Sequence, residues 1–162
     1  MDLKLHYDRD ISHDAYLFHE GKNYEAFNML GAHKYKKAGK KDGISFTVWA
    51  PRAKEVYLIG DFNDWNETSI PLARFAETGI WQVVVEGVQQ FDGYKYRLVS
   101  ETGEVRIKAD PFAFHAEERP RSASKYFDLN GYKWGDKTWN KNKSKKPVYN
   151  SAINIYEANI LS

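Results

Sequence analysis

ISFTVWAPRAKEVYLIGDFNDWN, residues 44–66, is the stretch of sequence that decides the fold class. Apolar residues recur with a period of two in ISFTVW, which is typical of a β-strand, and Pro51 ends that strand. EVYLIG, residues 55–60, predicts a second strand. The chain then turns through DFNDWN, in which Asp and Asn are common turn formers but Phe62 and Trp65 are not. The presence of two aromatic residues in a surface turn therefore needs a separate explanation.

Four more segments along the chain have the length and residue types of β-strands. They are IWQVVVEG (80–87), YKYRLVS (94–100), EVRIKAD (104–110) and a segment near KYFDL (125–129). Short strands at such spacing, with no long helical segment between them, indicate antiparallel sheets packed face to face. The fold class is therefore predicted to be all-β, an immunoglobulin-like β-sandwich over residues 44–129.

The residues before this sandwich have a different character. Residues 1–10 are charged and are expected to be loose. Ser12 can serve as the N-cap and Gly21 as the C′ residue of a short helix, and a second short helix is expected over residues 23–29. KYKKAGKKDG, residues 34–43, is expected to be a solvated connector that ends in an Asp-Gly turn.

After the sandwich, the sequence becomes polar and then apolar again. NGYKWGDKTWNKNKSKKP, residues 130–147, is rich in lysine and indicates an extended linker. AINIYEANILS, residues 152–162, is typical of a buried strand that belongs to another domain. The chain is thus divided into a tail with a short helical segment, a sandwich, a linker and the start of a further domain: residues 1–43, 44–129, 130–150 and 151–162.

Composition limits the classes of function. The chain has 162 residues, a net charge of +2 and no cysteine, so neither a disulfide nor a cysteine-ligated zinc site is possible. The N-terminal residues lack the apolar core of a signal peptide, and no apolar run approaches the ~20 residues that a membrane helix needs. We therefore expect a cytoplasmic protein with no nucleic-acid partner and no membrane partner.

The sequence also offers no metal or cofactor site. The five histidines show no pair at zinc-ligand spacing. A calcium loop that begins at Asp61 would need glycine and glutamate at the positions that Asn66 and Leu72 occupy. No cofactor and no bound metal are therefore expected.

Seven short motifs, spread over most of the chain, can be compared as a group with those of known families. They are LFHEG (17–21), LGAH (30–33), FTVWAP (46–51), GDFNDW (60–65), DGYKYRL (92–98), KADPFAF (108–114) and INIYEAN (153–159). Their order resembles the N-terminal part of a 1,4-α-glucan (glycogen) branching enzyme. FTVWAP or GDFNDW alone would suggest only the wider set of glycogen-binding sandwich modules.

The resemblance implies a parent enzyme with a catalytic (β/α)8 barrel, of which INIYEAN is the first strand. Asn159 and Leu161 stand where that strand usually has His and Gly. Branching enzymes cut an α-1,4 bond and transfer the glucan to a 6-hydroxyl, which requires two carboxyl groups ~5–5.5 Å apart. In the family both lie further along the barrel, so this chain is expected to have no catalytic residue. The nearby Asp61 and Asp64 are interpreted as shaping the turn.

The same resemblance assigns a sugar-binding role to two residues. Trp65 resembles a tryptophan that stacks on α-glucan in the glycogen-binding modules, because indole offers a flat apolar face. Lys95 resembles a lysine that hydrogen-bonds sugar hydroxyls, and its alternation with Tyr94 and Tyr96 places it on the polar face of its strand. A second platform tryptophan would fall near Val105, and valine cannot replace it.

A structural role for Trp65 is left open, because the ring could fold back as a lid over the sandwich or pack on the missing barrel. Trp49 and Trp81 belong to strands and are interpreted as core or sheet-face packing. Trp134 and Trp139 are interpreted as docking on the barrel.

Three functions are therefore compatible with the sequence. The first is the N-terminal module of a branching enzyme, which contributes α-1,4-glucan binding, barrel packing or both; its partners would be glycogen, starch or maltooligosaccharides and the barrel of the same parent chain. A stand-alone or regulatory α-glucan-binding module is the first alternative, and a purely structural sandwich is the second.

Overall fold

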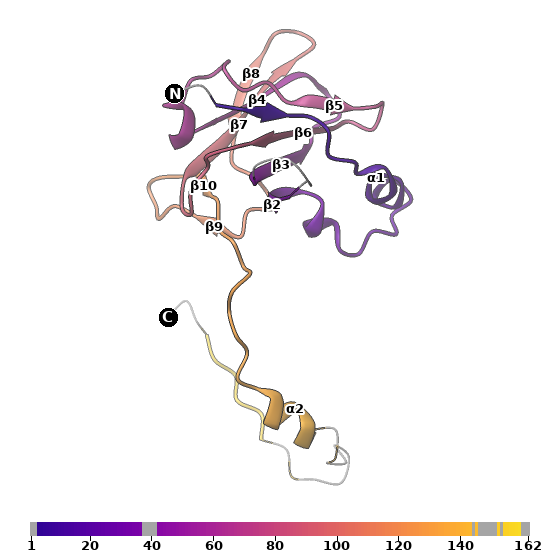
Figure 1. The fold of residues 1–162 in the computed structure, drawn as a ribbon, viewed down its shortest axis with the longest axis vertical. Coiled ribbons are helices and arrows are strands. Elements are labelled where there is room, and N and C mark those ends of the chain that lie inside the picture. The colour runs from indigo at the N-terminus through magenta and orange to yellow at the C-terminus, as the bar shows by residue number, and fades with distance from the viewer. Residues whose placement is uncertain (1–2, 37–41, 144, 146–151, 153, 160–162) are drawn as a thin grey trace. The chain divides into compact units, whose positions relative to one another are not determined.

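The computed structural model describes residues 3–36, 42–143, 145, 152 and 154–159. The chain forms two compact units, Met1–Leu129 and Asn130–Ser162. In the first unit, two antiparallel sheets lie face to face (Figure 1). The predicted all-β sandwich is therefore confirmed.

The first sheet contains five strands in the order β1-β6-β3-β2, with β5 also paired to β6. Every pairing is antiparallel. The strands are β1 (Leu5–His6), β2 (Gly31–Tyr35), β3 (Gly43–Trp49), β5 (Ala73–Phe75) and β6 (Ile80–Val85).

The second sheet has the order β4-β7-β10-β9, with β8 also paired to β7. One edge of β7 pairs with β4, and its other edge pairs first with β10 and then with β8. The strands are β4 (Ala53–Gly60), β7 (Gly93–Ser100), β8 (Val105–Lys108), β9 (His115–Ala116) and β10 (Ser124–Lys125).

The main core lies between the two sheets. Residues two apart on a strand point to the same side of their sheet, so alternate residues of each strand face this core. Phe46 of β3 meets Tyr94 of β7 edge-to-face, with ring centroids 5.0 Å apart. Val56 and Leu58 of β4 are buried in the same cluster. The alternation of residues in the sequence thus correctly predicts which side chains of the second sheet face the core.

Asp110 is a carboxylate inside this apolar interior. Its Oδ2 accepts hydrogen bonds from the hydroxyls of Tyr94 (2.8 Å) and Tyr96 (3.3 Å), and its Oδ1 accepts one from the backbone N–H of Phe112 (2.8 Å). Burial raises the pKa of Asp110, although these hydrogen bonds act in the opposite direction. The side chain therefore ties the segment after β8 to the inner face of β7.

The N-terminal segment contains the predicted helix, with a different start. Helix α1 spans Ser12–His19 and its N-cap is Ile11, so Ser12 is the first helical residue and its assignment as the cap was wrong. Asp10 Oδ1 accepts the backbone N–H of Ser12 at 2.9 Å, and that bond satisfies a donor at the helix start. Gly21 follows the helix with a φ of 67°, as predicted for a C′ residue.

Two more expectations about this segment need correction. The second helix is only a 3-10 turn, η1 (Ala26–Asn28), and it packs in a small cluster that includes Met29 and Leu30. The expected connector begins inside β2, where Lys34 and Tyr35 pair with Ile44 and Gly43 of β3. Pairing with a central strand outweighs the polar character of these residues. Residues 37–41 lie outside the described residues.

The charged tail is also not loose throughout. Leu5 and His6 form β1 and pair with Val85 and Val84 of β6. His6 Nε2 lies 2.7 Å from Glu86 Oε1. The sequence did not predict β1, β5 or β9, because each has only two or three residues and is defined by its partner strand.

In the second unit, helix α2 (Lys137–Lys143) forms where an extended linker was expected. Trp134 and Trp139 of this unit are exposed. Residues 154–159 carry no strand, and Ile155 and Tyr156 are exposed. That this segment begins a barrel stays a prediction.

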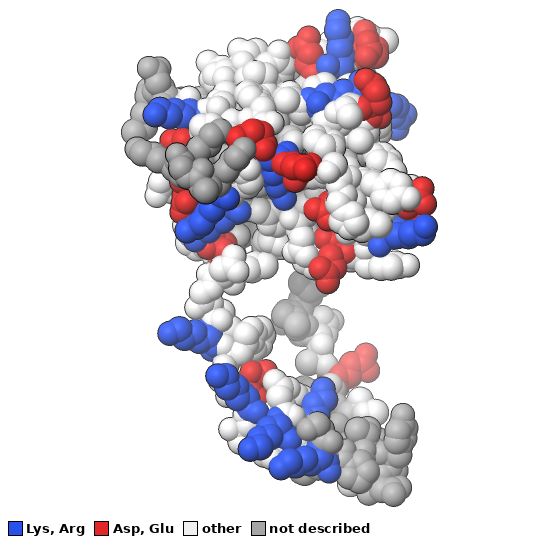
Figure 2. All heavy atoms as spheres, turned by 45° about the vertical axis from the view of Figure 1, so that its right-hand side comes forward, with Lys and Arg blue, Asp and Glu red and all other residues white. Residues whose placement is uncertain are grey.

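Charge is distributed differently on the two units. On the face shown in Figure 2, acidic and basic side chains are interspersed over the first unit, whereas basic side chains gather on the second. Within the described residues, no helix is both long and apolar enough to cross a membrane.

Candidate carbohydrate-binding site

The turn after β4 is held by its own polar side chains. Residues Asp61–Asn63 form a 3-10 turn, η2, and Asp64 and Trp65 follow in the left-handed region with φ of 53° and 56°. Asn63 Oδ1 accepts the N–H of Gly60 at 2.9 Å, and Asn63 Nδ2 donates to the carbonyl oxygen of Asn66 at 2.9 Å. Asn66 Oδ1 in turn accepts backbone N–H groups further along the turn. The turn therefore has one defined shape.

Asp61 connects this turn to β7. Its Oδ1 accepts the indole N–H of Trp65 at 2.9 Å, and its Oδ2 accepts the backbone N–H of Gly93 at 2.6 Å. One carboxylate thus fixes both the orientation of the indole and its distance from the sheet. The prediction that Asp61 shapes the turn by bonding the turn's own backbone was wrong, because its carboxylate bonds the Trp65 side chain and the backbone of Gly93, which lies 32 residues away in sequence.

The two aromatic residues of the turn point in opposite directions. Phe62 packs against the core, with its ring centroid 5.7 Å from that of Phe46. Trp65 remains 37% exposed. A Cβ atom at Gly93 would lie 3.4 Å from Cζ2 of Trp65, so the indole lies against β7 where that strand has no side chain. The exposed part of the indole is therefore available to a ligand.

Lys95 lies on the same face of β7 as this indole. Gly93 and Lys95 are two residues apart and therefore share the outer face of the second sheet, whereas Tyr94 and Tyr96 are fully buried on the inner face. Lys95 Nζ donates a hydrogen bond to Ser122 Oγ at 2.9 Å. The structure thus brings Trp65 and Lys95 together on one surface, with the lysine held in place but half-exposed.

Arg97 is a third side chain of this face, and its partner could not be predicted from the sequence. Arg97 Nε donates to Glu67 Oε2 at 2.9 Å, and its guanidinium lies 5.4 Å from the ring centroid of Tyr57. This ion pair is a second link between the turn and β7. Parity in YKYRL placed Arg97 beside Lys95, but nothing in the local sequence indicated Glu67 as its partner.

Val105 occupies the same face further along. It pairs with Val99 of β7, four residues from Lys95, and it is 45% exposed. Ile107, which pairs with Arg97, is exposed beside it. This end of the face therefore offers apolar area without a flat aromatic ring.

The two strand tryptophans differ from each other. Trp81 is buried and its indole N–H donates to the carbonyl oxygen of Ala50 at 3.1 Å, so its assignment as a packing residue is correct. Trp49 is 49% exposed and meets Phe18 edge-to-face, with ring centroids 5.6 Å apart. Trp49 thus packs on the face of the first sheet against α1 rather than in the core, which is the second of the two alternatives predicted for it.

Within the described ranges, no group of three His, Asp or Glu side chains could hold a metal ion. Both carboxylate oxygens of Asp61 accept hydrogen bonds from Trp65 and Gly93. That carboxylate is used to position the indole.

An antiparallel sandwich with an exposed indole and a lysine on one sheet face has the architecture of a carbohydrate-binding module. Consistent with this, the profile of carbohydrate-binding module 48 (isoamylase N-terminal domain) matches residues 29–113. The chain belongs to this family.

Similar proteins agree with the assignment. The chain is 41% identical over 149 residues to the 1,4-alpha-glucan branching enzyme GlgB of Bacillus subtilis, covering 92% of this chain and 24% of that protein. It is 44% identical over 144 residues to GlgB of Bacillus caldolyticus, covering 89% of this chain and 22% of that protein. It thus spans about a quarter of the length of these relatives.

A solved structure shares the fold. The maltotriose complex of a PulA mutant from Klebsiella pneumoniae is 26% identical, with a TM-score of 0.50 over 63% of this chain and 11% of that one.

Proposed function

We propose that this chain is the N-terminal module of a glycogen branching enzyme and that it binds α-1,4-glucan through Trp65 and Lys95. The observation that carries the proposal is the hydrogen bond from the Trp65 indole to Asp61, with Asp61 also bound to Gly93. An indole fixed in this way loses little conformational freedom when a sugar ring stacks on it.

The chemistry of the face fits a glucan. A glucose ring has an apolar C–H face that can cover the exposed indole, and its hydroxyls can accept hydrogen bonds from the ammonium group of Lys95. Lys95 is already held by Ser122, so its position beside the indole is defined before a ligand arrives. Glycogen, starch and maltooligosaccharides all present the same α-1,4-linked rings to such a face.

The affinity for one chain should be weak. Each exposed hydrogen bond contributes only ~0.5–1.5 kcal/mol, and one stacked ring adds ~1–2 kcal/mol from buried apolar area. A millimolar dissociation constant corresponds to about −4 kcal/mol, and maltoheptaose should bind no more tightly than this. Glycogen presents many chain ends, so its apparent affinity should be higher.

Affinity electrophoresis in a native gel that contains glycogen tests the proposal. The chain should be retarded, and Trp65→Ala should lose most of the retardation while its melting temperature changes little. Trp134→Ala is the matched control, because it removes an exposed tryptophan from the other unit. The proposal is wrong if Trp65→Ala melts at a much lower temperature and keeps the retardation.

A structural role for the sandwich is the second candidate. It is favoured by the contact of the Trp65 ring with Gly93, which covers part of the indole. In this candidate, the module packs on the catalytic barrel of the parent enzyme and the Asp61 network only stabilises the turn. Retention of Trp65→Ala on glycogen, together with a loss of stability, would favour this role.

The branching reaction itself belongs to the parent enzyme in this proposal. The carboxylate pair would lie in the barrel, so the present chain should leave the iodine-complex absorbance of amylose unchanged during long incubation. A cytoplasmic location and contact with the barrel are part of the same proposal.

A further inference from the structure

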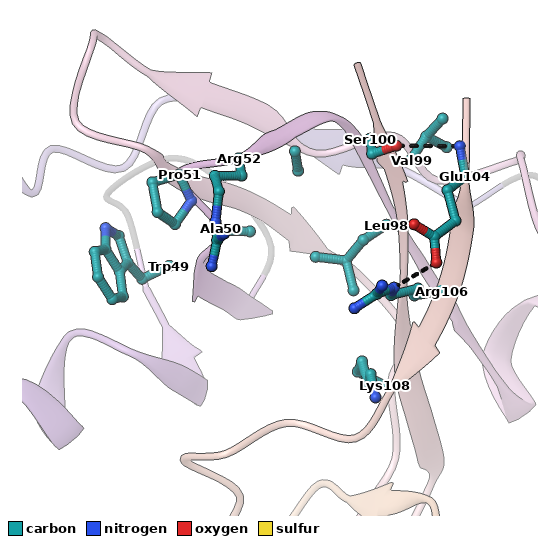
Figure 3. A pocket seen from close by; sticks show the side chains of 11 residues that line it. Trp49, Ala50, Pro51, Arg52, Leu98, Val99, Ser100, Glu104, Arg106 and Lys108 are labelled. Carbon is teal, nitrogen blue, oxygen red and sulfur yellow. Dashed lines mark hydrogen bonds and ion pairs between the residues drawn. The ribbon is translucent and has the colours of Figure 1, made fainter. Parts of the chain in front are cut away.

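The groove in Figure 3 has a volume of about 520 Å³ and is lined in part by side chains of β7 and β8. Arg106 and Lys108 pair with Leu98 and Tyr96, whose side chains lie on the inner side of the second sheet. Figure 3 shows Leu98, Arg106 and Lys108 on the same side of the groove. The Trp65 indole lies on the outer side of this sheet, so the groove is not an extension of the proposed sugar-binding face.

Phe91 precedes β7 and carries an exposed aromatic ring. Its side chain is 49% exposed. Its backbone N–H donates to the carbonyl oxygen of Tyr126 at 2.8 Å, and the N–H of Tyr126 donates to the carbonyl oxygen of Asp92 at 2.9 Å, so the pairing of β7 with β10 continues to this residue. Phe91 therefore stands two positions before Gly93, the residue against which the Trp65 indole lies.

Two neighbouring rings place the Phe91 ring on the outer side of the second sheet. His115 of β9 pairs with Lys125 of β10, which in turn pairs with Gly93 of β7, so these three positions share the outer side. The centroid of the Phe91 ring lies 5.5 Å from that of His115 and 5.5 Å from that of Phe127. The ring is thus exposed and restrained on the same side of the sheet as the proposed sugar-binding face.

The backbone of Phe91 has a conformation that a bulky residue rarely adopts. Its φ of 72° lies in the left-handed region, where a Cβ atom is crowded and glycine is preferred. Strained residues of this kind cluster at ligand-binding sites, and here the strained residue presents an aromatic ring to solvent. Glycine at this position would remove both the strain and the ring.

His115 places a hydrogen-bonding group beside this ring. Its Nδ1 lies 2.9 Å from the carbonyl oxygen of Ala116, and because a carbonyl oxygen can only accept, Nδ1 carries the proton. In the neutral imidazole, Nε2 is then the acceptor nitrogen and can accept a hydrogen bond from a sugar hydroxyl. A flat apolar ring with an acceptor at its edge matches the C–H face and the hydroxyl groups of a glucose ring.

We propose that Phe91 is a second stacking platform of the α-glucan site, with His115 as the hydrogen-bonding group beside it. This inference rests on the proposed function, because it takes the ligand class from Trp65 and Lys95. At about 3.3 Å per residue, the backbone positions of Phe91 and Gly93 are about 7 Å apart, and Lys95 follows at the same spacing. One oligosaccharide chain that runs along β7 can therefore contact both rings and the lysine, and the Phe91 contact supplies part of the weak affinity expected above.

Phe91→Gly is the central variant of the test, measured by affinity electrophoresis over a series of glycogen concentrations. Its apparent affinity should fall by about three- to tenfold, the range expected for one lost stacking contact. Its melting temperature should change little, because relief of the backbone strain offsets the lost ring contacts. Phe91→Tyr keeps an aromatic ring and should match the wild type. Ala76→Gly is the matched control, because Ala76 has a φ of 46° between β5 and β6 and the variant removes strain there without removing a ring.

Two further variants sharpen the test. His115→Ala should weaken the apparent affinity less than Phe91→Gly, because it removes one exposed hydrogen-bonding group and leaves the Phe91 ring in place. The residual retardation of Trp65→Ala should disappear in the double variant Phe91→Gly/Trp65→Ala. Melting temperatures of all variants separate a loss of binding from a loss of folded protein.

The outcomes separate this inference from the proposed function. If Trp65→Ala weakens the retardation but Phe91→Gly matches the wild type, the second platform is overturned and the proposed function stands. If Phe91→Tyr or Ala76→Gly is weakened as much as Phe91→Gly, the aromatic ring is not the cause and the platform is again overturned. If the wild type is not retarded at all, both proposals fail.

Discussion

Two carboxylates hold aromatic side chains on opposite faces of β7, and they do so in different surroundings. On the inner face, Asp110 accepts the hydroxyls of Tyr94 and Tyr96 and is itself only 6% exposed. On the outer face, Asp61 accepts the indole N–H of Trp65 and the backbone N–H of Gly93, and it is exposed. The arrangement is similar, but only the outer one leaves its aromatic ring accessible.

The two carboxylates should therefore affect different properties of the protein, Asp110 its stability and Asp61 the orientation of the exposed indole. Loss of Asp110 leaves donors buried without water, and that cost falls on the free energy of unfolding. Loss of Asp61 leaves the exposed indole N–H to water and only the part-buried N–H of Gly93 without its acceptor, so it should cost less stability than loss of Asp110 while the indole loses its orientation. The inner carboxylate therefore stabilises the sandwich, and the outer one, in the proposed function, orients the indole for binding.

The largest effect should come from Asp110→Ala. The variant leaves two buried tyrosine hydroxyls and the N–H of Phe112 without an acceptor, which should lower the free energy of unfolding by roughly 3 kcal/mol or more. Urea denaturation measures this change. Tyr94→Phe is the matched control, because it removes one hydroxyl together with its need for a partner and should cost clearly less.

Asp61→Ala should come next, at about 2 kcal/mol, because the variant loses a hydrogen bond from a part-buried backbone N–H and one from the indole. Its retardation by glycogen should fall as far as that of Trp65→Ala. Asp64→Asn is the control, because Asp64 is exposed and its left-handed conformation suits asparagine. Normal retardation of Asp61→Ala would show that the indole does not need this anchor.

Asp110 should also make stability depend on pH. Its pKa is raised in the folded state from an ordinary value of 3.8, so the folded chain holds this proton more tightly than the unfolded chain does. The corresponding stabilisation is complete below pH 3.8 and is lost as the pH rises through the folded-state pKa. Relative to Asp110→Asn, the wild type should lose at most about 1.4 kcal/mol per pH unit in that window. A constant difference between the two from pH 3 to 7 would contradict the burial argument.

Gly93→Ala should cost about 1 kcal/mol. The new Cβ would lie 3.1 Å from Asp61 Oδ2, so the carboxylate that holds the indole must shift, and it would touch Trp65 Cζ2 at 3.4 Å. Glycogen retardation should weaken more than the melting temperature falls. Gly135→Ala serves as the control, because its Cβ would meet no atom within 4 Å.

The smallest change in stability should come from Lys95→Ala, below about 0.5 kcal/mol, because Lys95 donates a single exposed hydrogen bond to Ser122. Its effect on glycogen retardation should be clear but smaller than that of Trp65→Ala. Lys125→Ala offers a control on the neighbouring strand β10. Equal retardation of Lys95→Ala and the wild type would remove Lys95 from the proposed site.

The sequence predicted those features that depend on neighbours in the chain. Period two in YKYRL correctly placed Lys95 opposite Tyr94 and Tyr96. The DFNDWN turn drew attention to Trp65, whose ring is partly exposed. Contacts between distant residues could not be read in the same way. The link from Asp61 to Gly93 depends on how β4 and β7 pair, and no local pattern encodes that register.

The same reasoning explains the errors. Lys34 and Tyr35 belong to a segment with the composition of a connector. They nevertheless pair with β3 and are therefore part of strand β2. Trp49 pairs with Ile80 on the side of the first sheet that faces α1, where Phe18 covers only part of its ring. Its exposure therefore depends on how far α1 extends over the sheet, which the sequence of one strand does not contain.

Strand β8 has a further consequence, for the behaviour of the protein at high concentration. All four of its residues are exposed, and β7 is its only pairing partner among the described residues. A free sheet edge with Val105 and Ile107 is a template on which a second chain can add a strand and begin aggregation. Arg106 and Lys108 alternate with these residues and place positive charge at the same edge. Two approaching copies would bring like charges together, so these cations keep the chains apart.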